Sequence, residues 1–571
     1  SRGLGDVYKR QFVKVSELSN KDKEYAAQEY EDNKDEYSKD WSELSETAKE
    51  RYYTKNDDAI LFVKNFEETG AAENTKKIEI RENDIFSDLI GFISESSGLT
   101  IFDIAYNATF PELGISSMML YSLKNHIEEK YNISIDAASV TANNTIRKMT
   151  GYIYSLVSGS ENISKKIKSN QYKIDTGNRY KPFPLNDIQK AYWVGRNKDV
   201  SWGGVSCYGY CEFDLKNLNL QKFEAAVKKL VERHEMLRTV IDSNGMQQIR
   251  HSSEIKIPLT IYSENDIENA KELAEKIRHE MEHMVIPTDR LRFEFRVLPL
   301  GDNIYRFFSG VDLMAADAMS LFLMWNDLDA LYNGEELPEI NSSFRDYVTY
   351  MSNPVKKEKY RKDKEFWMKK LEDFPPSPEL PVDLSLEKKE KGKFKRYQHL
   401  MNKDDWKRFV KISAGYGLTP SAALLAVYSE VLSGFGCGSR FGVIVTVFGR
   451  DNVSDDIVNV MGDFTKLALV DIKRDDVSFV QNALNIQNEL QESIYHSDFS
   501  AVEYIKEIGK VSAENNIYPV VFTSGIGSEK ITQNMFFDNV IYSSSTTPQV
   551  FMDHQVCLLY TSPSPRDISG S

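Results

Sequence analysis

The chain has 571 residues, of which 41% are hydrophobic, 12% aromatic and 27% charged, and its net charge is −15 at pH 7. This length predicts two to four domains of a folded protein. The acidic balance, without any basic block, argues against nucleic acid as the main partner, and no apolar run approaches the ~20 residues that a membrane-spanning helix needs. We therefore expect a cytoplasmic protein with neither nucleic acid nor membrane as a partner.

The cysteine content indicates free thiols. Four cysteines, Cys207, Cys211, Cys437 and Cys557, are too few for a disulfide scaffold in a chain of this length. Cys207 and Cys211 could be two ligands of a metal ion, but no Cys or His pair follows at a matching spacing. We predict no metal site.

The two ends differ in composition from their neighbours. Residues 1–11 (SRGLGDVYKRQ) and 557–571 (CLLYTSPSPRDISGS) resemble translated adapter sequence that flanks assembled fragments, so we expect the native protein to continue past both. Residues 12–80 are strongly charged and rich in tyrosine. They predict short helices or a linker, and we assign them no function.

Residues 81–158 predict a small all-α domain. Apolar residues recur at helical spacing in three stretches, around 85–93, 117–133 and 146–156. Three or four helices in so short a segment are typical of a small four-helix bundle. The stretch 159–179 is rich in Ser, Asn and Lys without periodic hydrophobicity, and predicts a linker.

The segment 110–120 (FPELGISSMML) resembles the carrier-domain motif Leu-Gly-x-x-Ser of nonribosomal peptide and polyketide synthases, with Leu113, Gly114 and Ser117 at the matching positions. In that family a phosphopantetheinyl transferase attaches 4′-phosphopantetheine from coenzyme A to this serine. The resemblance therefore implies that Ser117 carries the arm, at a helix N-terminus that favours the phosphodiester charge. Asp commonly precedes the serine, and Ser116 stands there instead, so Ser116 is the alternative. Without the motif, Ser117 would be a plain N-cap.

Residues 180–556 alternate strand and helix patterns and predict an α/β domain. Amphipathic or apolar helices are expected at 225–231 and 421–432, and strands at 201–214, 304–311 and 441–448.

The nine residues from Asp312 to Ser320 follow one of these strands and precede an expected helix. The apolar residues of this helix recur at helical spacing and stop before Asn333 and Gly334. Asp317 and Ser320 would share one face near the positive end of this helix, with Asp312 on the loop before it. By themselves, two acids and a serine at a helix start indicate no more than an N-cap with a solvated first turn.

Five segments in order resemble the motifs of heterocyclization domains, a branch of the condensation family of nonribosomal peptide synthetases. They are FPLNDIQKAYWVGR at 183–196, DLMAADAMS at 312–320, GDFT at 462–465, PVVFTS at 519–524 and TPQVFMDHQ at 547–555. The resemblance covers nearly all of 180–556. It implies a chloramphenicol-acetyltransferase-like fold of two lobes with a tunnel between them, which two carrier arms enter from opposite ends.

One substitution in the signature motif points to the chemistry. Ordinary condensation domains have His-His-x3-Asp-Gly, and alignment on the shared acid places Asp312 and Leu313 at the two histidines. Leucine cannot transfer protons. The resemblance implies that Thr523 and Asp553, which family members use for cyclodehydration, act instead: Asp553 as acid/base and Thr523 as the donor that holds the intermediate. Spacing alone would make them a strand threonine and a loop acid.

The acids of the signature motif have expected structural roles. In the wider family the acid at Asp317 pairs with an arginine, and Arg296 is the expected partner here. We expect Asp312 and Ser320 to hold the loop that lines the tunnel.

Together these resemblances imply a carrier followed by a heterocyclization domain, with upstream and downstream synthetase domains and carriers as partners. The domain would join the acyl group on Ser117 to Cys, Ser or Thr on a downstream carrier and cyclise the product to a thiazoline or oxazoline. The alternatives are an ordinary condensation or epimerisation domain, which Leu313 disfavours, and a noncatalytic docking or scaffold module.

Overall fold

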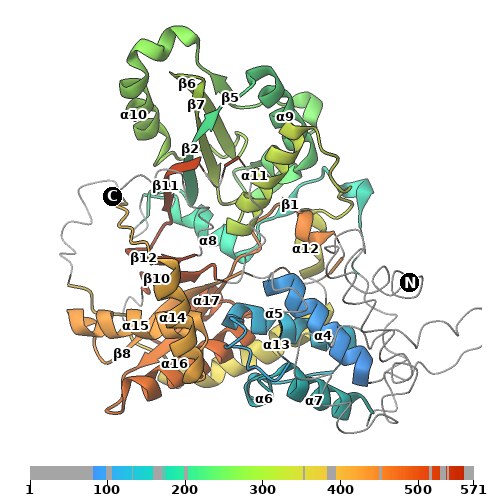
Figure 1. Cartoon of the computed structure of the whole chain (residues 1–571), viewed down its shortest axis with the longest axis vertical. Coiled ribbons are helices and arrows are strands. Elements are labelled where there is room, and N and C mark those ends of the chain that lie inside the picture. Colours follow the sequence, from blue (N-terminus) through green and yellow to red (C-terminus); the bar gives the residue numbers. More distant parts are fainter. Residues whose placement is uncertain are drawn as a thin grey trace, which may run out of the picture. The chain divides into compact units, whose positions relative to one another are not determined.

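The computed structural model describes residues 82–557, except 98–103, 105, 132, 159–171, 173, 199–202, 352–353, 382–393, 449, 451–452, 455, 513–516, 527–534 and 537–538. The predictions for residues 1–80, for most of the linker 159–179 and for 558–571 lie outside this part. The chain divides into two compact units, residues 1–168 with 407–420 and residues 169–406 with 421–571 (Figure 1).

The first unit is helical in its described part. It contains α4 (Glu82–Ser97), α5 (Ser117–Tyr131), α6 (Ala137–Ala142), α7 (Ile146–Ser158) and most of α14 (Lys403–Gly415). The three predicted helical stretches correspond to α4, α5 and α7. Their apolar stripes form one core, because residues spaced by three and four lie on the same helix face. Its fully buried members are Ile85, Leu89, Ile127, Ile146, Met149 and Ile153.

A polar contact between helices adds to this core. Asp88 on α4 accepts hydrogen bonds from His126 Nε2 at 2.9 Å and from the Tyr131 hydroxyl at 2.9 Å, both on α5. The pKa of Asp88 is lowered, because hydrogen bonds from His126 and Lys130 outweigh the effect of burial, which acts in the opposite direction.

The second unit contains a five-stranded sheet in the order β11-β2-β7-β6-β5. Its strands are β2 (Tyr208–Lys216), β5 (Leu259–Ile261), β6 (Phe293–Gly301), β7 (Ile304–Asp312) and β11 (Val540–Thr546). All neighbours are antiparallel except β5 and β6. β2 begins later than the strand predicted from residue 201, because Gly204 has φ +82° and turns the chain before the pairing starts.

Helices cover both faces of this sheet. α9 (Leu220–Arg233) and α11 (Ala318–Asn333) pack on the face that carries Phe293, Phe295 and Phe307. α10 (Ala270–Met281) packs on the opposite face, with Leu298 and Phe308. Successive side chains of a strand point to opposite faces, so Phe307 and Phe308 belong to different cores.

A second sheet has the order β12-β10-β8-β9. Its strands are β8 (Arg440–Val447), β9 (Lys466–Lys473), β10 (Val520–Ser524) and β12 (Met552–Val556). β8, β10 and β12 are parallel, and β9 is antiparallel to β8. The strand predicted at 441–448 is β8. Four of the described helices contact the strands of this sheet: α13 (Pro354–Lys369), α15 (Pro420–Leu432), α16 (Phe479–Tyr495) and α17 (Ala501–Val511). α12 (Phe344–Met351) instead packs into the core of the five-stranded sheet.

A short third sheet joins β1 (Phe183–Pro184), β4 (Met246–Ile249) and β3 (Thr239–Ile241), and α8 (Asp187–Gly195) follows β1. The connection from β11 to β12 passes from the five-stranded sheet to the four-stranded one within a few residues. The second unit is therefore of mixed α/β class, as the alternating patterns predict. The bundle arrangement of the first unit and the tunnel in the second stay predictions.

Candidate functional site

Asp312 is the last residue of β7, and its carboxylate is fully buried. Oδ2 accepts hydrogen bonds from Arg196 Nη1 at 2.7 Å and from Arg292 Nη1 at 3.3 Å, and Oδ1 accepts from the Met314 backbone N–H at 3.1 Å. Burial lowers the pKa of Arg292 to about 10, although the Asp312 charge acts against this shift. Asp312 thus pairs with two buried cations at the start of the signature turn.

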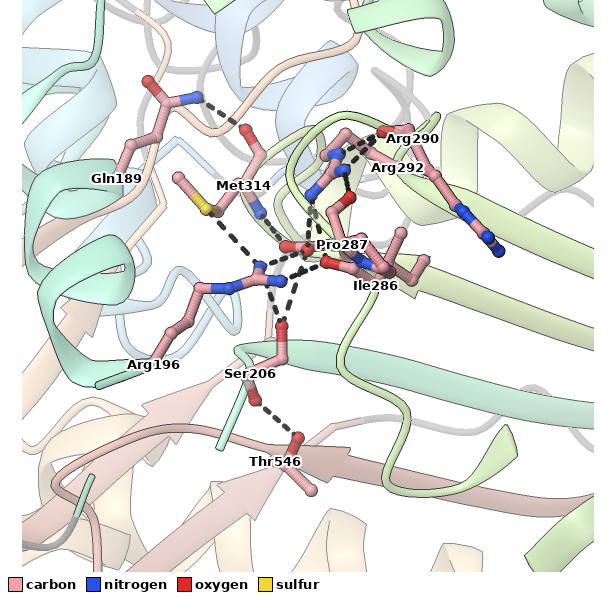
Figure 2. A network of polar contacts seen from close by, with 10 residues as sticks. Gln189, Arg196, Ser206, Ile286, Pro287, Arg290, Arg292, Met314 and Thr546 are labelled. Atoms are coloured by element: carbon pink, nitrogen blue, oxygen red, sulfur yellow. Dashed lines mark hydrogen bonds and ion pairs between the residues drawn. The ribbon is translucent and has the colours of Figure 1, made fainter. Parts of the chain in front are cut away.

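Figure 2 shows how this network joins separate elements. Arg196 directly follows α8, and its guanidinium also donates to the Ile286 carbonyl. Gln189, in the first turn of α8, donates from Nε2 to the Met314 carbonyl at 2.5 Å. The Thr546 hydroxyl at the end of β11 donates to the Ser206 carbonyl at 2.7 Å. The segment 183–196 is therefore fastened to the signature turn by polar contacts.

Asp317 and Ser320 lie at the N-terminus of α11. Asp317 is the N-cap: its Oδ1 accepts from the Ser320 N–H at 2.7 Å, and its Oδ2 accepts from the Phe464 N–H at 3.3 Å. The Ser320 hydroxyl donates to the Gly462 carbonyl at 2.9 Å and accepts from the Gly462 N–H at 3.1 Å. The two side chains together hold the start of α11 against the segment 462–465.

The prediction that Arg296 pairs with Asp317 is wrong. Arg450 Nη2 lies 3.6 Å from Asp317 Oδ1, whereas Arg296 pairs with Glu280 and Glu294, each at 2.6 Å. Arg296 points to the face of β6 that α10 covers, because side chains alternate along the strand, while α11 lies on the other face. The position of Arg450 just beyond the buried strand at 441–448 was the available signal in the sequence.

Thr523 and Asp553 lie on neighbouring parallel strands. β10 and β12 pair with Val521 opposite Asp553, and Thr523, two residues further along, points to the same face. Thr523 Oγ1 is 3.4 Å from Asp553 Oδ1 and 3.0 Å from Thr446 Oγ1 on β8. The structure therefore brings together the two residues that the sequence places 30 positions apart.

The half-buried Asp553 carboxyl has two hydrogen-bond donors. Gln555 Nε2 donates to Oδ2 at 2.6 Å, and Thr523 faces Oδ1. Burial raises the pKa of Asp553, and the hydrogen bonds from Gln555 and Thr523 offset only part of that effect. The group therefore holds its proton to higher pH than an ordinary aspartic acid, as suits an acid/base. Thr446 and Gln555 were not among the predicted site residues.

Asp463, in the segment 462–465, is a buried acid that the sequence reasoning also missed. Its side chain is 1% exposed; Oδ1 accepts from the Thr465 N–H at 3.1 Å, and Oδ2 has no hydrogen-bond partner among the described residues. Burial raises the pKa of Asp463 well above its usual range, and the charges of Asp317 and Asp312 raise it further. A carboxyl in this setting holds its proton to higher pH than an ordinary aspartic acid.

The two carrier serines differ in their contacts. Ser116 Oγ accepts a hydrogen bond from the Met119 N–H at 3.2 Å, so it acts as the N-cap of α5. Ser117 is the first residue of α5, and its hydroxyl lies 2.8 Å from Thr419 Oγ1 of the same unit. The capping role suggested for Ser117 thus belongs to Ser116. Ser117 is 3% exposed in this structure. Its place at the N-terminal end of α5 is one that favours negative charge, as an attached phosphodiester would carry.

The described residues contain no group of three or more His, Cys, Asp and Glu side chains that could hold a metal ion. No single helix among them is long and apolar enough to cross a membrane. One sharply bent pair, Lys403–Gly415 with Pro420–Cys437, meets that test by length and composition alone.

Comparison with known families matches residues 180–546 to the condensation domain and residues 87–153 to the phosphopantetheine attachment site. The latter match indicates covalently attached 4′-phosphopantetheine as the cofactor. The two segments follow each other in the order that the sequence motifs predict.

The chain is similar to large synthetases. It is 31% identical over 462 residues to bacitracin synthase 1 of Bacillus licheniformis, covering 78% of this chain and 9% of that protein. It is 28% identical over 450 residues to phenyloxazoline synthase MbtB of Mycobacterium sp. (strain MCS), covering 78% of this chain and 38% of the relative. The chain thus spans well under half the length of either protein.

A solved structure resembles it as well. The cyclization-docking bidomain of the nonribosomal peptide synthetase EpoB from Sorangium cellulosum superposes with a TM-score of 0.64 at 27% identity, covering 73% of this chain and 84% of that one. The chain therefore belongs to the condensation-domain family of nonribosomal peptide synthetases, with a phosphopantetheine-bearing carrier domain ahead of the condensation domain.

Proposed function

We propose that the condensation-family domain is a heterocyclization domain. It joins the acyl group carried on the arm at Ser117 to a Cys, Ser or Thr on a downstream carrier, and then closes a thiazoline or oxazoline ring. The observation that carries this proposal is the contact of Thr523 and Asp553 on adjacent strands, with the pKa of Asp553 raised by burial. Leu313, where amide-forming relatives have a proton-transferring histidine, supports it.

The names of two relatives agree with this chemistry. One is a phenyloxazoline synthase and the other a cyclization-docking bidomain. Bacitracin synthase 1, the third, carries no ring chemistry in its name. The names favour a ring-forming reaction, and the site geometry supplies the residues for it.

The phosphopantetheine arm, when attached to Ser117, holds the acyl group as a thioester and allows it to extend from the carrier domain. Peptide-bond formation on it releases one thiol and leaves an amide on the downstream carrier. In the second stage the side-chain sulfur or oxygen attacks the amide carbonyl carbon and a C–S or C–O bond forms as the carbonyl π bond breaks. The proton of the S–H or O–H group passes to the carbonyl oxygen, which becomes a hydroxyl. Loss of this hydroxyl with a proton, and of the proton on nitrogen, gives a C=N bond and one water.

Asp553 is suited to move the protons of this second stage. In its neutral form it donates a proton to the departing hydroxyl, and the resulting carboxylate accepts the proton released from nitrogen. The Thr523 hydroxyl, held between Asp553 and Thr446, orients the carboxyl and can hydrogen-bond the oxygen of the intermediate. Asp312, Asp317 and Ser320 are engaged with arginines and backbone groups, which favours structural roles for them.

Mass spectrometry of the product on the acceptor carrier tests the proposal. The 571-residue chain, loaded at its own carrier with an acetyl group, is mixed with a carrier protein that bears cysteine, serine or threonine. The expected product is lighter than the corresponding amide by one water. Asp553→Asn and Thr523→Ala should stop at the amide, Asp553→Asn with a fall in ring formation of roughly 10²- to 10⁴-fold.

Asp214→Asn is the matched control, because Asp214 is also a strand aspartate and pairs with Arg306 outside this site. It should leave ring formation unchanged. An uncyclised amide from the wild-type chain with all three amino acids would identify an ordinary condensation domain. Failure to form even the amide would favour a docking or scaffold module.

A further inference from the structure

A row of polar side chains crosses three parallel strands of the four-stranded sheet. Thr446 on β8 is the register partner of Thr523 on β10, and Asp553 on β12 continues the row on the other side. Because β10 lies between β8 and β12, Thr446 is one strand further from Asp553 than Thr523 is. The path from Thr446 to the carboxyl therefore runs through the Thr523 hydroxyl.

The hydroxyl of Thr446 stands out in its strand. In β8, whose sequence is RFGVIVTV, Thr446 is the only residue with a hydroxyl group. Its neighbours Val445 and Val447 are buried, whereas Thr446 is half-buried and points to the face that carries Thr523. Valine has a similar shape and also favours strands. The strand itself therefore does not need this hydroxyl.

The hydroxyl of Thr523 lies closer to Thr446 than to Asp553. Thr523 Oγ1 is 3.0 Å from Thr446 Oγ1 and 3.4 Å from Asp553 Oδ1. The usual range of hydrogen bonds between oxygens ends at about 3.0 Å, so Thr446 provides the closer anchor. Both threonines are branched at Cβ, which restricts rotation about χ1 and gives the two hydroxyl oxygens definite positions.

The second oxygen of the Asp553 carboxyl determines where the acid proton resides. Gln555 Nε2 donates a hydrogen bond of 2.6 Å to Asp553 Oδ2. A protonated oxygen is a weaker acceptor, so the proton of the neutral acid favours Oδ1, which faces Thr523. The Thr523 oxygen then accepts from the acid, and its own O–H needs a further acceptor, which Thr446 Oγ1 supplies.

We propose that Thr446 is a positioning residue for ring formation, whose hydroxyl fixes the direction of the Thr523 hydroxyl in both protonation states of Asp553. The inference rests on the proposed function. While the acid is neutral, Asp553 donates to Thr523, and Thr523 donates to Thr446. Once Asp553 has given its proton to the departing hydroxyl of the intermediate, Thr446 donates to Thr523, and Thr523 donates to the carboxylate.

This exchange moves no proton between the threonines. Each hydroxyl keeps its own O–H bond, and only the direction of the two hydrogen bonds reverses as Asp553 loses and regains its proton. A hydroxyl with partners on both sides is held in place, whereas one with a single partner can rotate away from it. Peptide-bond formation does not use Asp553 in the proposed function, so Thr446 should matter for ring closure alone.

Two substitutions of Thr446 test the inference. Thr446→Val keeps the shape of the side chain and loses the hydroxyl, whereas Thr446→Ser keeps the hydroxyl and loses the methyl group. In the assay with the acetyl group and a cysteine-bearing carrier, Thr446→Val should lower the rate of ring formation about 5- to 50-fold. Amide formation should continue at the wild-type rate, which also reports that the domain is folded. Thr446→Ser should form the ring at close to the wild-type rate.

Ser421→Ala is the matched control, because it removes another contact between two hydroxyl groups on β10. Ser421 Oγ is 2.8 Å from Ser524 Oγ. Ser524 follows Thr523 directly in β10, so its side chain points to the opposite face of the sheet. The control should change neither amide formation nor ring formation.

The outcomes separate this inference from the proposed function. If the wild-type chain forms the ring, Asp553→Asn does not, and Thr446→Val equals wild type, the role of Thr446 is refuted while the proposed function stands. Equal losses in Thr446→Val and Thr446→Ser, or equal falls in both steps, would place Thr446 in packing and overturn the inference. A loss of ring formation in Ser421→Ala as large as in Thr446→Val would overturn it too. A wild-type chain that makes only the amide would overturn the proposed function itself.

Discussion

Gln555 Nε2 donates a hydrogen bond of 2.6 Å to Asp553 Oδ2, and it also donates to Ser545 Oγ at 3.0 Å. Ser545 belongs to β11 of the five-stranded sheet and Asp553 to β12 of the four-stranded sheet. The carboxyl proposed as the acid/base is thus held at the junction of the two sheets by a side chain two residues away.

Gln555→Leu should move the pH dependence of ring formation upward. Burial raises the pKa of Asp553, and the Gln555 hydrogen bond lowers it by stabilising the carboxylate. Ring formation needs the protonated acid, so its rate falls as pH rises past this pKa. Without the Gln555 side chain the pKa of Asp553 rises further, so the rate of ring formation falls only at higher pH. A pH–rate profile of ring formation measures the shift.

Gln481→Leu is the control, because Gln481 bonds to Asn485 on the exposed side of α16. It should leave the profile unchanged. A Gln555→Leu profile that coincides with wild type, or that moves to lower pH, would refute the assignment of Asp553 as the titrating acid.

Asp463→Asn should make stability less dependent on pH. The pKa of Asp463 is raised in the folded state, so above its usual value of 3.8 the unfolded chain loses this proton first. The free energy of unfolding of the wild-type chain therefore falls as pH rises from that value toward the folded pKa, by about 1.4 kcal/mol per unit of pKa difference. Asparagine does not titrate and removes this fall.

Urea denaturation measures the free energy of unfolding of both chains from about pH 4, near the ordinary pKa of a carboxyl group, to about pH 8. The variant should gain stability relative to wild type as pH rises. A difference that stays constant over the range would show that Asp463 is ionised in the folded protein.

Asp312→Ala should destabilise the second unit strongly. The Asp312 carboxylate is fully buried and is shared by Arg196, 9% exposed, and Arg292, 1% exposed. Removing it leaves two buried cations without their counter-charge, which costs about 3–5 kcal/mol. Chemical denaturation measures the loss.

Arg361→Ala is the matched control for an ion pair at the surface, since Arg361 and Glu365 are both 56% exposed. Such pairs contribute at most about 0.5 kcal/mol. Similar losses in the two variants would contradict the view that Asp312 is a buried structural anion.

Ser117→Ala should abolish attachment of the phosphopantetheine arm, whereas Ser116→Ala should retain it. Ser116 Oγ is engaged in capping α5, so its removal should cost about 1 kcal/mol of stability instead. Intact-protein mass spectrometry after incubation with coenzyme A and a phosphopantetheinyl transferase counts the arms. Attachment that persists in Ser117→Ala and disappears in Ser116→Ala would move the site to Ser116.

Local patterns determined a large part of this protein. The helices α4, α5 and α7 follow from apolar residues at spacings of three and four, and β7 with α11 follows from an apolar run, a capping aspartate and a terminating glycine. The linear motifs sufficed to predict both the carrier and the condensation family, because each motif lies within about a dozen neighbouring residues and survives without knowledge of the fold.

Tertiary structure alone decided the pairings between distant residues. The sequence carries no direct record of strand order, so it could not place β10 between β8 and β12, which sets Thr446, Thr523 and Asp553 side by side. It equally could not exclude Arg296 as the partner of Asp317, because that choice depends on which sheet face each helix covers. Short-range periodicity determines which residues are helical or extended. The contacts between side chains that lie far apart in the sequence depend on how the helices and sheets pack, which no local pattern encodes.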